Sequence, residues 1–140
     1  MSALVTNIRN GHKEGKEGTW DFNCWGATLY ALGEMADLVW ICASDMMDFL
    51  NEKTREVTEQ EVMQKGDILV LYGYDEDAMF EMDYNEDGDE IVLIHTAIYL
   101  GRGIFWHKMG ANKSEFATQE EVVQGYEADF EYSEVRRLKN

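Results

Sequence analysis

Three side chains have the types that nucleophilic catalysis uses: Cys24, His95 and His107. A cysteine attacks carbonyl carbon as its thiolate, and a neighbouring imidazole can take the thiol proton and return it to the leaving group. Zinc takes the same ligand types, but the chain has neither a C-x-x-C nor an H-x-x-x-H pair. The residue types therefore favour a thiol and imidazole site, and we expect no metal and no cofactor.

Cys24 begins a stretch of good helix formers, CWGATLYALGEM, in which Gly33 lies near the end. The spacing of its apolar residues predicts a mostly buried helix with Cys24 in the first turn. Unpaired backbone N–H groups and the helix dipole at that position favour a thiolate. A buried cysteine is also often an inert apolar side chain, so position alone does not decide its role.

His95 interrupts an apolar, β-prone run from Glu90 to Gly101, and His107 lies in the next such run. Gly101-Arg102-Gly103 separates the two runs and predicts a hairpin reversal. Two strands joined there bring the histidines close to facing each other, within one residue. One imidazole could then serve as base and the other as its orienter, although strand histidines are often satisfied core residues.

The remaining patterns predict the elements around these residues. One helix is expected from an N-cap at Ser44 or Asp45 through residue 53. The Thr58–Glu61 capping box predicts a short helix at 58–64, and the Thr118–Glu121 box predicts another helix after it. Strands are expected at 67–73, 90–101, 103–110 and 131–138, the last with Arg136 and Arg137 outermost, and residues 9–18 are expected to form an exposed loop. Helices followed by a meander of strands favour one α+β domain, residues 1–140.

The chain has 28 acidic and 12 basic residues, a formal net charge of −16 at pH 7. Such a charge repels nucleic acid and anionic lipid surfaces, so we expect neither as a partner; a basic protein partner is compatible with it. No apolar run is long enough to span a bilayer, and the first residues do not resemble a secretion signal. We expect free thiols and a cytoplasmic protein, or one delivered by a phage or a secretion machine.

The order of three segments, FNCWGATLYAL, KGDILVLY and HTAIYLGRGIFWH, resembles the NlpC-type cell-wall peptidases of the papain-like cysteine hydrolase superfamily. The resemblance spans roughly residues 20–110, and its most specific part is the histidine strand with the second histidine after it. It implies a papain-like α+β fold with N-terminal helices packed on an antiparallel β-sheet. It also implies Cys24 as nucleophile, His95 as base and His107 as orienter of the imidazole.

The same resemblance implies cleavage of an amide bond in a peptide-like substrate, such as a peptidoglycan stem peptide, through a thioester. Asp21, Asn23 and Trp25 surround the nucleophile in sequence and would contact substrate. Papain-like acyltransferases and deamidases use the same three catalytic groups, so the reaction class stays open. A non-catalytic acidic binding or inhibitory protein is the alternative of another kind.

An acidic segment separates the first two strong strands and includes Asp83, Asn85 and Asp87. These positions match the first half of a calcium-binding loop, with glycine at the sixth place. Ile94 stands at the twelfth place, where a bidentate glutamate is needed. The pattern predicts at most a weak calcium site, and a solvated acidic loop fits it better.

Overall fold

The computed structural model describes residues 3–74, 83–84 and 90–139 of the chain. Its helices and strands in chain order are α1 (Ala3–Glu14), α2 (Cys24–Ala31), α3 (Ala43–Lys53), β1 (Thr54–Glu56), β2 (Ile68–Gly73), β3 (Asp83–Tyr84), β4 (Glu90–Gly101), β5 (Ile104–Lys108), β6 (Ser114–Thr118), α4 (Gln119–Gln124) and β7 (Phe130–Leu138). Three helices therefore precede all of the described strands, as the α+β expectation requires.

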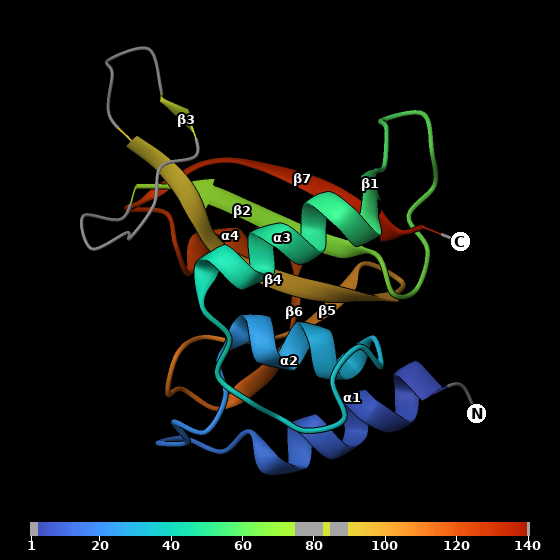
Figure 1. Ribbon diagram of the computed structural model, residues 1–140, viewed down its shortest axis with the longest axis vertical. Helices are drawn as coiled ribbons and strands as arrows, with labels where there is room; N and C mark the ends of the chain where they lie inside the picture. The colour runs from blue at the N-terminus through green and yellow to red at the C-terminus, as the bar shows by residue number, and fades with distance from the viewer. Residues whose placement is uncertain (1–2, 75–82, 85–89, 140) are drawn as a thin grey trace.

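The described strands form an antiparallel sheet in the order β1-β7-β2-β4-β5-β6, and β3 pairs with β4. β7 is the last strand in sequence but lies between β1 and β2, so it is an interior strand of the sheet and not an edge strand (Figure 1). The hairpin of β4 and β5 pairs Ile98 with Trp106 and Tyr99 with Phe105. This is the register that the sequence predicted for the two histidine strands.

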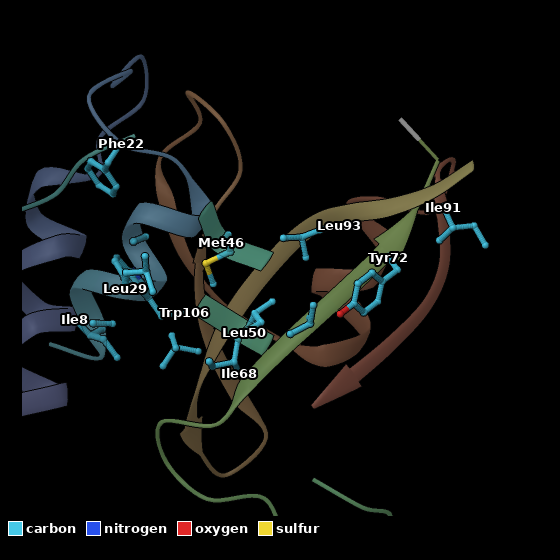
Figure 2. Packing of buried hydrophobic residues seen from close by; sticks show 14 residues of the cluster. Ile8, Phe22, Leu29, Met46, Leu50, Ile68, Tyr72, Ile91, Leu93 and Trp106 are labelled. Atoms are coloured by element: carbon cyan, nitrogen blue, oxygen red, sulfur yellow. The ribbon is translucent and has the colours of Figure 1, made fainter. Parts of the chain in front are cut away.

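Two hydrophobic clusters cover the two faces of the sheet. The first joins α1, α2 and α3 to the sheet and includes Ile8, Leu29, Met46, Leu50, Ile68, Leu93 and Trp106, whose side chains converge between helices and strands in Figure 2. The second joins α4 and β6 to the opposite face and includes Leu69, Leu71, Ala97, Phe105, Ala117 and Val122. Because side chains alternate along a strand, a residue of β4 or β5 faces one cluster or the other.

The expectation of an exposed loop over residues 9–18 is wrong for its first part, because α1 continues to Glu14. Gly11 lies inside this helix and is buried. A Cβ at Gly11 would stand 2.6 Å from the Trp106 ring, so the glycine allows the helix to approach that indole closely. The glycine therefore serves packing between α1 and β5, where the sequence pattern indicated a loop.

The short helix expected at 58–64 is also absent, and these residues form turns. The Thr58 N–H does donate to Glu61 Oε1, but the Glu61 carboxylate also pairs with Arg55 and Arg137. Val62 is 83% exposed, so burial of this apolar side chain does not stabilise a helix here. The capping box at Thr118 and Glu121, by contrast, does begin helix α4.

Arg137 was expected to be outermost but is not, because it forms a bidentate ion pair with Asp67. Asp67 is only 1% exposed. Its Nε donates to Asp67 Oδ1 at 2.8 Å and its Nη2 to Asp67 Oδ2 at 2.9 Å. Arg136 is likewise engaged, with Thr54 and Glu134. The Gly-Asp pair at 66–67 thus anchors β7 beside the start of β2.

Two further boundaries differ from expectation. α3 begins at Ala43, one residue before the predicted caps, and β6 was not predicted at all. β6 is short, and its buried residues Ser114 and Ala117 are separated by two exposed ones, so the sequence lacks the strict alternation that predicts a strand. Within the described residues, no helix is long and apolar enough to cross a membrane.

Replacing Arg137 with Met should lower the free energy of unfolding by about 3 kcal/mol, because it leaves the buried Asp67 carboxylate without its cation. Urea unfolding followed by circular dichroism measures this change. Arg55→Met is the matched control, since Arg55 is exposed and also pairs with Glu61, and it should change stability little. Equal effects of the two substitutions would contradict a structural role for the Asp67 pair.

Candidate active site

The first turn of α2 is fixed by the side chain of Asn23. Its Oδ1 accepts the Gly26 N–H at 2.9 Å, which caps the helix, and its Nδ2 donates to the Ile41 carbonyl at 2.8 Å. A Cβ at Gly26 would stand 1.7 Å from the Val39 carbonyl oxygen, so only glycine permits the chain to cross there. The segment at 39–41 therefore lies against the turn that carries Cys24.

Two hydroxyl groups join this turn to β4, immediately after His95. Thr28 Oγ1 and Thr96 Oγ1 are 2.7 Å apart, and Thr96 Oγ1 donates to the Cys24 carbonyl at 3.4 Å. Both threonines are buried. Because buried hydroxyl groups need partners, this small network fixes the α2 N-terminus against the histidine strand.

β4 and β5 stop pairing just before they reach the two histidines. Their register runs from Gly101–Ile104 to Ile98–Trp106 and ends there, although β5 continues through Lys108. On the other side of β4, a bulge interrupts the pairing with β2 next to His95. Bulges redirect side chains and recur beside active sites. The regular pairing of β4 is thus interrupted on both sides close to His95.

The two histidines bridge the opened strands through their rings. His95 Nε2 and His107 Nδ1 are 2.8 Å apart, and the rings meet edge to face. His95 Nδ1 is 2.9 Å from the hydroxyl of Tyr126, whose ring stacks on the imidazole. His95 is fully buried and His107 is 3% exposed. His107 Nε2 is buried and has no partner in the described structure.

Burial lowers the pKa of His95 well below its ordinary value, and the nearby His107 lowers it further. Burial also lowers the pKa of His107, while the charges of Glu115 on β6 and Glu121 on α4 act in the opposite direction. Both rings are therefore neutral at pH 7. A neutral ring has one donor and one acceptor nitrogen, so the pair has a defined direction of hydrogen bonding.

Cys24 is 7% exposed, and burial raises the pKa of its thiol to about 12. The backbone N–H groups of Thr96, Trp25 and Cys24 itself, together with the charge of Lys108, lower the pKa but do not offset the burial. Because the backbone N–H of Thr96 acts on the thiol, the sulfur lies close to the backbone amide that follows His95. Within the described contacts, no hydrogen bond joins the thiol to the His95 ring.

Lys108 is a buried cation next to this turn. Its Nζ donates to the carbonyl oxygens of Thr19 and Gly110 and lies 5.0 Å from the centre of the Phe22 ring. Burial lowers the pKa of Lys108, and the charges of Cys24 and Asp21 raise it. The lysine thus holds the segment that precedes α2 against the end of β5.

Three residues were predicted to contact substrate, and the structure gives them different surroundings. Asp21 is exposed, whereas Asn23 is buried with its Oδ1 and one N–H in use within the protein. The Trp25 indole N–H is buried and has no partner among the described residues. Their contact with substrate stays a prediction.

Sequence reasoning missed Tyr126 and Lys108. Nothing in the spacing around Tyr126 indicates that it meets His95 from another element, whereas Lys108 directly follows a predicted site histidine and its burial is a tertiary effect. The predicted calcium positions Asn85 and Asp87, and the side chain of Asp83, lie outside the described residues. In the part that is described, no group of acidic, histidine and cysteine side chains could hold a metal.

The sequence matches no family model and no curated protein. Among solved structures, the fold is similar to that of a Staphylococcus aureus protein described as similar to lipoprotein, NLP/P60 family. The TM-score is 0.52 and the sequence identity 17%, over 100% of this chain and 43% of that chain. The fold is that of the NLP/P60 family. This confirms the predicted NlpC-type α+β architecture, with N-terminal helices packed on an antiparallel sheet.

Within this NLP/P60-like fold, His95 and His107 should titrate below about pH 6.5, the usual value for imidazole, because burial disfavours the charged form. NMR titration of the histidine ring protons, assigned with a His107→Gln variant, measures the midpoints. The unfolded chain binds these protons first, so stability should decline as the pH falls below that value. Midpoints above it for both rings would contradict the buried, neutral pair.

Proposed function

We propose that the protein is a cysteine hydrolase, a peptidase or amidase that cleaves an amide bond through a thioester on Cys24. The observation that carries this proposal is the buried His95–His107 pair, 2.8 Å apart, beside the strand residue that is hydrogen bonded to Cys24. In the proposed site, His107 orients the imidazole of His95 through this hydrogen bond. The NLP/P60-like fold supports the same assignment.

In the proposed reaction, the Cys24 sulfur attacks the carbonyl carbon as its proton passes to His95 Nδ1. His107 accepts the hydrogen bond from His95 Nε2–H and so leaves Nδ1 as the basic nitrogen of the ring. The backbone N–H of Cys24 stabilises the negative charge on the tetrahedral oxygen. His95 then protonates the leaving amine, the C–N bond breaks, and water hydrolyses the thioester to release the acid and restore the thiol.

A peptide-like substrate, with a peptidoglycan stem peptide as the first case to test, fits the surroundings of Cys24. Asp21 is an exposed carboxylate three residues before the nucleophile and suits a substrate amine. Trp20 and Trp40 are exposed and stack with ring centres 6.3 Å apart. Trp40 follows Val39, whose carbonyl lies against Gly26. We propose that these side chains contact the substrate next to the scissile bond.

The same three groups would serve an acyltransferase or a deamidase, which differ in what attacks or leaves the thioester. Water is the simplest acceptor, so hydrolysis is the form proposed. A binding protein of acidic surface would leave Cys24 without covalent chemistry. Mass spectrometry after acid quenching separates the two ideas, because only the enzyme accumulates an acyl group on Cys24.

The Cys24→Ser variant should lose stem-peptide cleavage by about 1,000-fold or more, as removal of a catalytic nucleophile does in other hydrolases. Liquid chromatography with mass detection follows the peptide fragments. Cys42→Ser is the matched control, since Cys42 is the other free cysteine and is exposed, whereas Cys24 is buried. Cleavage that survives Cys24→Ser, or no turnover and no acylation with any peptide amide, would sink the proposal.

A further inference from the structure

Both ring nitrogens of His95 are already occupied. Nε2 meets His107 and Nδ1 meets the hydroxyl of Tyr126 at 2.9 Å. A base that is to take the Cys24 proton must offer it a free nitrogen lone pair. In this arrangement the nitrogen that would do so carries the phenol hydroxyl, and the thiol has no hydrogen bond to the ring.

The direction of these hydrogen bonds follows from the chemistry of the groups. Burial, and then the charge of Cys24, raise the pKa of Tyr126, so the phenol keeps its proton and donates it to His95 Nδ1. His95 Nε2 therefore bears the hydrogen and donates to His107 Nδ1. His107 then carries its own hydrogen on Nε2, the buried atom that has no partner among the described residues. The resulting tautomer of His95 has its lone pair on Nδ1, as a base for the thiol needs, but the Tyr126 hydroxyl already occupies that nitrogen. We call this the capped arrangement.

Tyr126 is held in place by its backbone. Its N–H donates to Val123 O at 2.9 Å, and its carbonyl accepts from Asp129 at 3.0 Å and Phe130 at 2.8 Å. The following turn is joined to the end of β2, where Tyr74 N–H donates to Asp129 O. The phenol ring stacks on the imidazole with centres 4.5 Å apart. The hydroxyl is thus presented to His95 by a fixed turn, not by a freely rotating surface side chain.

We propose that Tyr126 is a positioning residue that sets the tautomer of His95 and competes with the Cys24 thiol for His95 Nδ1. The inference rests on the proposed function, because it assigns His95 as the base. In the capped arrangement the thiol stays protonated, and it becomes a nucleophile when the phenol gives up the nitrogen. Loss of the Tyr126 hydroxyl should therefore increase the reactivity of the Cys24 thiol. If the hydroxyl instead assisted the proton transfer, its loss would decrease that reactivity.

Several other groups act on this proton transfer and must be held constant. His107 on β5 contacts the other nitrogen of His95, and Glu115 on β6 and Glu121 on α4 act on His107. Lys108 on β5 acts on the Cys24 thiol. The test therefore changes only the Tyr126 hydroxyl and leaves these charges in place.

The experiment measures alkylation of Cys24 by iodoacetamide in a Cys42→Ser background, followed by mass spectrometry from pH 5 to 10. Tyr126→Phe keeps the stacked ring and should raise the rate at pH 7 about tenfold or more, with the half-maximal pH moving downward. Tyr99→Phe is the matched control. It removes a phenol of the same cluster, whose oxygen accepts from Gly103 N–H rather than contacting His95 among the described residues, and it should leave the rate unchanged.

A double variant decides whether the gain passes through His95. Adding His95→Gln to Tyr126→Phe should abolish the acceleration, because the freed nitrogen is then gone. An equal acceleration in the His95→Gln background would mean that the Tyr126 hydroxyl only restricts access to Cys24, and this result would overturn the proposal. A Tyr126→Phe alkylation rate at or below that of the unchanged protein would overturn it as well. The measurement needs no substrate, so its outcome is separate from that of the peptide assay.

Discussion

The attachment of the α2 N-terminus to β4 at Thr96 is the constraint on which the site depends. Two hydroxyl groups and one carbonyl join residues that are far apart in sequence, and they do so at the position after His95. Asn23 and Gly26 shape the same turn from the other side. Cys24, the proposed nucleophile, therefore takes its position from the packing of helix on sheet, and the sheet contributes the two imidazoles from a single hairpin.

Burial determines the electrostatics of this site more than charge does. It raises the pKa of the thiol and lowers the pKa values of both imidazoles, so each group is neutral where it stands. A neutral thiol and a neutral imidazole make a resting state without an internal ion pair. The protein surface, with its formal charge of −16, has little part in this balance, because solvent screens exposed charges.

The sequence predicted the parts of the molecule that rest on local rules. The hairpin register of β4 and β5 follows from the glycines at 101 and 103, and α4 follows from the box at Thr118 and Glu121. Errors arose where tertiary contacts override local preference. Gly11 indicated a loop but packs on Trp106, and Glu61 indicated a helix but pairs with two arginines. Tyr126 could not be predicted, because only the completed sheet brings it to His95.

The hairpin has a consequence for the order in which the protein folds. The two histidines are separated by twelve residues and meet within one local unit, whereas Cys24 and Thr96 are 72 residues apart. Loops of this length close more slowly than hairpins. The imidazole pair should thus assemble before α2 docks on the sheet, and Cys24 reaches Thr96 only when that docking is complete. A partly folded chain would then hold its proposed base before its proposed nucleophile is in place.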